Sequence, residues 1–364
     1  MRNLPRKTIF CTFYSFKGGV GRTISLVNTA VTLARAGKKV IIWDMDIEAP
    51  GVQNIPFFKD IKDKISGGFI DLALKFQESE YKKSSIQNLE NYLVEHNEFA
   101  NIQLLPAGNL ENDDYGAKYS SIDFSKLFPN DKEEQPGLIL FDQICLQLLA
   151  LAPDFVLIDS RTGYTDIGGV CCYLIPDIVF LVFNYGHQNL SGIRSVYNSL
   201  TSEKTRALRE KEIKVHLIAS MVPTGQFGVL GLKDERTKEW DKYKLDKRIE
   251  IGYLPEVALN ETIVTEKYPN EPESQSYKDI SRILLSESDT LALSEDKAKK
   301  SENEVSQSRL VLRMYSEKPF EKKVAELFQK HKLYKKLLEP KGVEYTKYVS
   351  KKYYLMMQYW SLKI

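Results

Sequence analysis

The chain has 364 residues, and its 51 basic and 49 acidic side chains leave a formal net charge of +2. That charge is too small to demand an acidic partner. A hydrophobic share of 43% supports a packed core. The length allows one large α/β domain with a smaller appendix.

A glycine-rich octet lies near the start of the chain, between an apolar strand and a helix. Residues 8–14 are β-branched and aromatic, and residues 23–36 carry apolar side chains at helical spacing. Between them, residues 16–23 read FKGGVGRT. A glycine turn before a helix leaves backbone N–H groups free to bind phosphate. The octet predicts a phosphate loop, with Phe16 in place of the usual first glycine and Arg22 in place of the usual lysine.

Two further apolar strands end in aspartates. Residues 39–43 lead into Asp44 and Asp46, and residues 155–158 lead into Asp159. Ligands bind at the carboxyl ends of the strands in open α/β sheets, so Asp159 is predicted to lie at a ligand site. We interpret Asp44 as a residue that solvates the strand end.

The segments between these strands are less regular. Residues 57–99 predict amphipathic helices, and the polar residues 109–136 predict an exposed excursion. Residues 138–158 predict a buried helix followed by a strand rather than a membrane span, because they include Asp142 and Asp154.

The cysteines and the N-terminus favour a cytoplasmic protein. The chain has four cysteines, of which Cys171 and Cys172 are adjacent and poorly placed to bridge each other. The first seven residues run directly into the first strand and leave no room for a signal peptide. We expect no transmembrane segment.

The composition changes near residue 289. Residues 289–316 are rich in charged residues and serine, which predicts a linker or a solvated helix. Residues 317–364 hold twelve lysines against five glutamates, interleaved with aromatic residues, and predict a basic helical extension. We favour packing or docking on a partner for this tail, with nucleic acid or an anionic membrane second.

Taken together, the octet, the Asp44–Asp46 segment and the strand ending at Asp159 resemble the deviant Walker A ATPases of the ParA/MinD class. The octet closely resembles their KGGVGR-motif variant, and the resemblance covers roughly residues 7–288. It implies an α/β fold: a mostly parallel sheet with helices on both faces, as in P-loop NTPases, over residues 1–288. Residues 289–316 would then be the charged linker and residues 317–364 a small, mainly helical extension.

The resemblance also implies a site for ATP and Mg²⁺. The catalytic residues would be Lys17, Asp46 and Arg22, with Lys17 reaching the nucleotide of a dimer partner and Asp46 orienting the attacking water. Thr23, Asp159 and Asp46 would hold the metal. The nucleotide-binding residues would be Lys17, Gly18, Gly19, Val20, Gly21, Arg22, Thr23, Ile24 and Pro255. Ser220 and Met221 stand where the class often has an asparagine that reads the base.

Several functions are compatible with these features. The resemblance favours a homodimer in the ATP state that acts as a switch for an unidentified protein partner in a bacterial conflict or anti-phage system. One alternative is a positioning ATPase like ParA or MinD, whose basic tail binds DNA or membrane. Another is a nucleotide sensor with little turnover, because Arg22 replaces the usual lysine. A bacterial tyrosine kinase shares the loop, but Lys17 argues against it.

Overall fold

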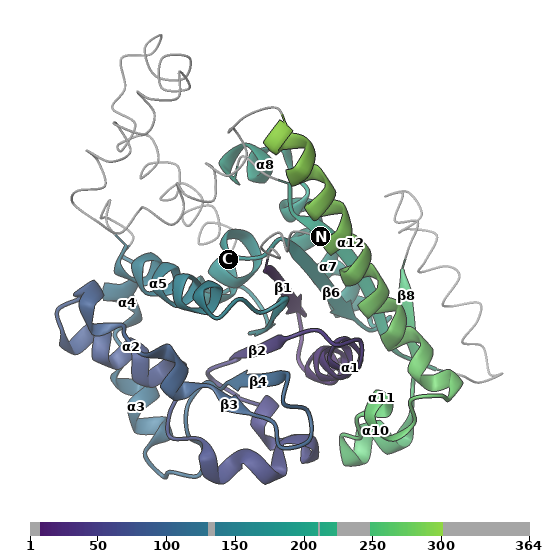
Figure 1. Ribbon diagram of the computed structural model, residues 1–364, viewed down its shortest axis with the longest axis horizontal. Coiled ribbons are helices and arrows are strands. Elements are labelled where there is room, and N and C mark those ends of the chain that lie inside the picture. The colour runs from purple at the N-terminus through teal and green to yellow at the C-terminus, as the bar shows by residue number, and fades with distance from the viewer. Residues whose placement is uncertain (1–7, 130–134, 210–211, 224–247, 301–364) are drawn as a thin grey trace.

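The described residues form an eight-stranded sheet at the centre of the molecule, in the order β3-β4-β2-β5-β1-β6-β7-β8 (Figure 1). The structure is a computed structural model and describes residues 8–129, 135–209, 212–223 and 248–300. The strands are β1 (Ile9–Tyr14), β2 (Val40–Met45), β3 (Val94–Glu95), β4 (Ile102–Leu105), β5 (Phe155–Ser160), β6 (Ile178–Phe183), β7 (Lys214–Val222) and β8 (Ile249–Gly252). Apart from the antiparallel pair β3–β4, the strand pairs are parallel. The predicted fold class is confirmed.

Helices cover both faces of the sheet. The longer ones are α1 (Arg22–Arg35), α2 (Phe69–Glu78), α5 (Pro136–Ala150), α7 (His187–Leu200) and α12 (Gln275–Lys300). Shorter α-helical segments are α3 (Tyr115–Ser121), α4 (Phe124–Leu127), α6 (Asp166–Gly169), α8 (Glu203–Arg209), α10 (Pro255–Asn260) and α11 (Val264–Lys267). The remaining turns are η1 (Val52–Asn54), η2 (Pro56–Lys64), η3 (Lys83–Ser85), η4 (Leu89–Tyr92), η5 (Val170–Leu174) and η6 (Pro272–Ser274).

Side chains of β1 alternate between two hydrophobic clusters, one on each face of the sheet. Ile9, Cys11 and Phe13 belong to the cluster that includes α1 and α12. Phe10 and Tyr14 belong to the cluster that includes α2, α5 and α7. This period of two is the geometry of a strand that is buried on both faces, and it explains why the sequence of β1 is apolar throughout.

Helix α1 is joined to the C-terminal helices by polar contacts. The backbone N–H of Thr265, in α11, donates to the side-chain oxygen of Asn28 at 2.8 Å. The hydroxyl of Ser281, in α12, donates to the carbonyl of Thr29 at 3.4 Å. Figure 1 shows α12 running beside α1. The helix that follows the glycine-rich loop is therefore held by segments more than 200 residues away in sequence.

The prediction of an exposed excursion over residues 109–136 is wrong for part of the described residues from 122 onward. Ile122, Leu127 and Phe128 are buried in a hydrophobic cluster. The ring of Phe128 packs so closely on α5 that a Cβ atom added at Gly137 would lie 2.4 Å from it. Because α3 and α4 are short, their apolar residues show no helical period that the sequence could reveal.

The C-terminal part of the chain continues as helix beyond the predicted boundary at residue 288. The backbone of α12 runs to Lys300, so the first part of the predicted linker is helical. Residues 301–316 and the predicted extension 317–364 lie outside the described residues. Their division into linker and extension stays a prediction.

Two further observations concern the cysteines and the helices. All four cysteines are free thiols. Among the helices that the structure describes, none combines the length and the apolar character that a membrane crossing requires.

Candidate nucleotide site

The glycine-rich loop leaves the start of α1 open. Gly19 and Gly21 have φ values of 70° and 72°, in the left-handed region that glycine adopts without strain. Gly21 precedes the first residue of α1, and no side chain caps the first turn. The first N–H groups of the helix are therefore free to bind an anion, with the helix dipole favouring negative charge.

Phe16, which stands in place of the usual first glycine, packs its ring against α7 and the segment after β5. A Cβ atom added at Gly192, in α7, would lie 2.0 Å from the ring of Phe16. The ring also meets Tyr164 edge to face, with 5.5 Å between centroids. Phe16 thus anchors the start of the loop to α7 and to the segment after β5.

A cavity of about 420 Å³ lies over the loop. Its loop side consists of Ser15, residues 18–24, Asp46, Ala49 and Thr162. Its β8 side consists of Ser220, Met221, residues 251–254, Val257, Ala258, Glu261 and Tyr277. The loop and the carboxyl end of β2 thus meet in one cavity, as the parallel topology predicts.

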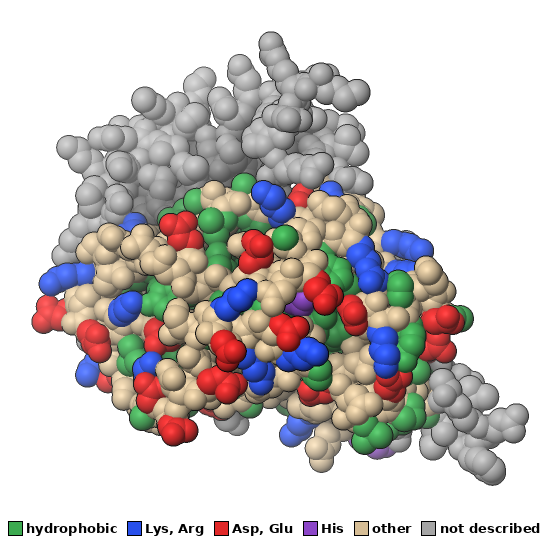
Figure 2. All heavy atoms as spheres, turned by 60° about the horizontal axis from the view of Figure 1, so that its bottom comes forward, with side chains coloured by type: hydrophobic (Ala, Val, Ile, Leu, Met, Phe, Trp, Pro, Cys, Tyr) green, Lys and Arg blue, Asp and Glu red, His purple; other side chains and the backbone are tan. Residues whose placement is uncertain are grey.

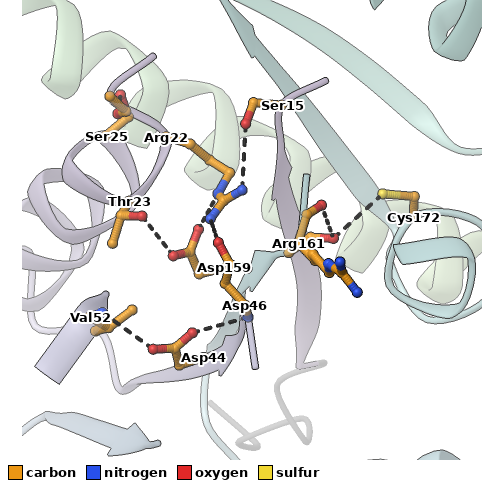
Figure 3. A network of polar contacts seen from close by, with 12 residues as sticks. Ser15, Arg22, Thr23, Ser25, Asp44, Asp46, Val52, Asp159, Arg161 and Cys172 are labelled. Atoms are coloured by element: carbon orange, nitrogen blue, oxygen red, sulfur yellow. Dashed lines mark hydrogen bonds and ion pairs between the residues drawn. The ribbon is translucent and has the colours of Figure 1, made fainter. Parts of the chain in front are cut away.

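Arg22 joins Asp46, predicted as a catalytic residue and metal ligand, to Asp159, predicted as a metal ligand (Figure 3). Its Nε–H donates to Asp159 Oδ1 at 2.6 Å, and its Nη2–H donates to Asp46 Oδ2 at 2.7 Å. A third, longer bond of 3.4 Å reaches the hydroxyl of Ser15. The guanidinium is only 7% exposed, and Asp159 is fully buried. A planar guanidinium fork suits this double pairing, because two of its nitrogens point at different carboxylates, whereas a lysine ammonium is a compact point charge.

The charges of this cluster shift its proton affinities. Burial alone would lower the pKa of Arg22, but the carboxylates of Asp159 and Asp46 outweigh it and raise that pKa. Burial raises the pKa of Asp46, and the charge of Arg22 opposes the shift without cancelling it. Arg22 is therefore a permanent cation in the site.

Thr23 and Asp159 face each other at the start of α1. The Thr23 hydroxyl donates to Asp159 Oδ2 at 2.8 Å, while the other oxygen of Asp159 binds Arg22. One hydroxyl and one carboxylate beside a phosphate loop fit Mg²⁺, because this ion takes few protein ligands and completes its shell with phosphate and water. No group of three or more His, Cys, Asp or Glu side chains placed to hold a metal ion occurs in the described part of the chain.

Asp44 is buried, so its interpretation as a solvating residue is wrong. The side chain is 1% exposed, and its two oxygens accept the backbone N–H groups of Asp46 at 3.1 Å and Val52 at 3.2 Å. Burial and the neighbouring Asp159 and Asp46 charges raise the pKa of Asp44 to about 8. Asp44 thereby holds the turn that carries Asp46.

The same turn is held from outside by α3, a contribution that sequence reasoning missed. The hydroxyl of Tyr115 donates to the Ile47 carbonyl at 2.7 Å, and the hydroxyl of Tyr119 donates to Glu48 Oε1 at 2.6 Å. Glu48 also forms an ion pair with Arg161, after β5. We call Tyr115, Tyr119, Glu48 and Arg161 the turn clamp. The two tyrosines, four residues apart on one helix face, were the available signal.

The other predicted residues occupy different positions. Lys17 is exposed beside the loop and is not among the described residues that line the cavity. Its ammonium lies 5.9 Å from the ring centroid of Phe16. Val20 is buried beneath the loop, and Ile24 lines the cavity. Pro255 is the first residue of α10, next to the cavity-lining Leu254.

Residues 7–207 match the family model described as an AAA domain, which is more than half of the 364 residues. The chain belongs to this family. The AAA domain match includes the loop, Asp46 and Asp159, but it ends before β8, α10 and α12. The β8 side of the cavity is therefore built largely by residues beyond the matched range.

Known proteins extend the likeness over more of the chain. The septum site-determining protein MinD of Helicobacter pylori is 24% identical over 291 residues, which covers 77% of this chain and 91% of that protein. The fold matches a chain of the MinC:MinD cell division protein complex of Aquifex aeolicus with a TM-score of 0.52, at 19% identity, over 76% of this chain and 96% of that one. It matches a putative plasmid partition protein of Borrelia burgdorferi bound to AMPPNP with a TM-score of 0.53, at 18% identity, over 77% of this chain and all of that one.

The AAA domain of this chain thus has a ParA/MinD-like P-loop fold, which confirms the resemblance at the level of the class. The KGGVGR-motif variant stays a prediction. Ser220 and Met221 lie at an irregularity in the pairing of β7 with β8, where Met221 has a left-handed φ of 55°. Backbone strain of this kind is frequent at binding sites.

Proposed function

We propose that the protein binds and hydrolyses Mg-ATP, and that its ATP-bound state is a homodimer that controls a partner protein. The proposal rests above all on one observation: the open loop, Asp46 and Thr162 line one cavity. The setting in a bacterial conflict or anti-phage system rests on the KGGVGR resemblance.

The residues of the loop side have distinct parts in this proposal. The backbone N–H groups of Gly18 to Thr23 hold the β-phosphate, as the uncapped start of α1 favours. Thr23 and Asp159 hold Mg²⁺, which when bound neutralises charge on the phosphate oxygens. Asp46 orients the attacking water, and the turn clamp keeps Asp46 in place.

The position of the Lys17 side chain supports the proposal of an ATP-bound dimer. Its side chain is exposed, does not line its own cavity, and forms no ion pair with another described residue. A cation in this position is free to reach the phosphates of a second copy, where it would stabilise charge in the manner of a trans-acting finger.

The proposal is tested by measuring solution mass by light scattering with ATP, ADP and a non-hydrolysable analogue, together with phosphate release. We expect a dimer with ATP. Lys17→Ala should retain nucleotide affinity within about twofold and lose turnover by about a thousandfold. Lys39→Ala, which removes another exposed lysine, is the control and should behave as wild type. A mass that does not depend on nucleotide would contradict the dimeric switch.

A nucleotide sensor with little turnover is a second candidate, and the position of Arg22 favours it. The guanidinium holds both Asp46 and Asp159, so both carboxylates are engaged before any ligand binds. Arg22→Lys keeps the positive charge but loses the planar fork that holds both carboxylates in the wild type. If the sensor description holds, wild-type turnover is low and this variant raises it about tenfold. Unchanged or lower turnover in Arg22→Lys would count against the sensor.

A positioning ATPase is the other candidate, supported by the likeness to MinD and to a plasmid partition protein. The basic tail on which this alternative depends lies outside the described residues. On the face in Figure 2, basic and acidic side chains are interspersed. If the basic tail binds DNA phosphates, the affinity of the full chain for DNA should fall steeply as the salt concentration rises. Binding to DNA that does not depend on salt would contradict this alternative.

A further inference from the structure

The β8 side of the cavity contains a buried tyrosine whose hydroxyl has no partner. Tyr277, in α12, is 2% exposed and lines the cavity. No described residue forms a hydrogen bond with its hydroxyl. Burial alone raises the pKa of Tyr277, which leaves the hydroxyl protonated and able to donate.

Such a hydroxyl is an exception among the fully buried tyrosines that the structure describes. Buried tyrosine hydroxyls normally find a partner, because an unmade hydrogen bond costs free energy. Tyr14 donates to the Gly163 carbonyl at 3.0 Å, and Tyr115 and Tyr185 also have partners. The Tyr277 hydroxyl is not among the described polar atoms that are both unpartnered and sealed from solvent, so it remains reachable through the cavity.

The surroundings of Tyr277 fix it relative to the loop. Its ring belongs to a cluster that includes Ile24 from α1 together with Leu254 and Val257. One turn further along α12, Ser281 binds the Thr29 carbonyl of α1. The hydroxyl therefore has a fixed place on a wall whose lining side chains are mostly apolar, with Ser220 and Glu261 as other polar residues.

We propose that the Tyr277 hydroxyl donates a hydrogen bond to the nucleoside part of the bound nucleotide, and that Tyr277 thereby contributes to nucleotide specificity. The inference rests on the proposed function, because it requires that the cavity bind a nucleoside triphosphate. The nucleoside is the part of the nucleotide expected next to Tyr277. The loop amides bind the phosphates, and the mostly apolar side chains of the β8 side suit a base. The acceptor is a ribose oxygen or a base heteroatom.

The test compares wild type with Tyr277→Phe by calorimetric titration of ATP, 2′-deoxy-ATP, GTP and inorganic tripolyphosphate, and by thermal unfolding without ligand. Tyr277→Phe should bind ATP about fivefold more weakly and tripolyphosphate as wild type does. Its melting temperature without ligand should equal that of wild type, because no protein partner is lost. Tyr14→Phe is the matched control: its hydroxyl has a protein partner, so its unliganded melting temperature should fall by about 2–4 °C.

The outcomes separate this inference from the proposed function. If Tyr277→Phe loses affinity for ATP but not for 2′-deoxy-ATP, the contact is at the ribose 2′-hydroxyl. If it loses affinity equally for both, the contact is elsewhere on the nucleoside. Unchanged ATP affinity, an equal loss for tripolyphosphate, or a fall in unliganded melting temperature like that of Tyr14→Phe would each overturn the role of Tyr277. Wild-type protein that binds none of the nucleotides would overturn the proposed function itself.

Discussion

On the loop side of the cavity, Arg22, Asp46 and Asp159 satisfy one another, whereas on the β8 side the hydroxyl of Tyr277 has no partner among the described residues. The loop side therefore contributes to stability without a ligand, and a ligand there must compete with existing ion pairs. The β8 side contributes little polar stabilisation and leaves a donor available. Loss of the Arg22 side chain should therefore act strongly on folding as well as on the site, whereas loss of the Tyr277 hydroxyl should act mainly on binding.

The largest expected effect is the loss of Arg22. Arg22→Ala leaves the carboxylates of Asp46 and Asp159 buried without their cation, and it should lower the free energy of unfolding by about 3–5 kcal/mol. Arg161→Ala removes an ion pair with Glu48 that is partly exposed, and should cost about 1 kcal/mol or less. Urea unfolding measures both. Equal losses would show that burial does not distinguish the two ion pairs.

A second effect concerns the anchor of the loop. In Gly192→Ala the new methyl group meets the ring of Phe16, so the ring must move, at a cost of about 1–3 kcal/mol. Adding Phe16→Ala should recover part of that cost. Gly116→Ala, in α3, meets open space and should leave stability unchanged or slightly raised. If both glycine variants behave alike in thermal unfolding, Phe16 does not anchor the loop.

A smaller loss of stability is expected when a hydrogen bond of the turn clamp is removed. Tyr119→Phe removes the hydrogen bond to Glu48 and should cost about 0.5–1.5 kcal/mol, which appears as faster amide exchange over residues 46–52. Tyr92→Phe removes a hydroxyl that contacts the surface residue Lys75, and serves as the control. Exchange that is equally fast in the two variants would mean that α3 does not hold the turn.

A separate effect, which is seen only when the pH is varied, is a change in the slope of the free energy of unfolding against pH. Because the pKa of Asp44 is raised to about 8 in the folded protein, the native state binds more protons than the unfolded one below that pH. The contribution of Asp44 to stability is therefore lost as pH rises from about 4 to about 8. Asp44→Asn cannot ionise and should flatten this dependence in urea unfolding. If the free energy of unfolding falls more steeply with rising pH in Asp44→Asn than in wild type, the pKa of Asp44 is not raised in the folded protein.

The elements next to the loop could be predicted because their signals are local. The strands β1, β2 and β5 are short, mostly apolar runs, and Asp44, Asp46 and Asp159 lie within or directly after such a run. The contacts that shape the site are not local: Arg22 and Asp159 are 137 residues apart, and Tyr119 and Glu48 are 71 apart. Sequence patterns carry no information on which distant side chains meet. For that reason the burial of Asp44, the turn clamp and the unpartnered hydroxyl of Tyr277 became visible only in three dimensions.

The polar contacts between α1 and the C-terminal helices have a consequence for the order of synthesis. Ser281 is made 252 residues after Thr29, its partner on α1. A nascent chain would therefore carry the complete phosphate loop while one face of α1 still lacks its covering helix. Domains tend to fold as units as the chain emerges from the ribosome, so this face would wait for the last described helix. The nucleotide site is thus completed only after α12 has been made, although its phosphate loop precedes that helix by more than 200 residues.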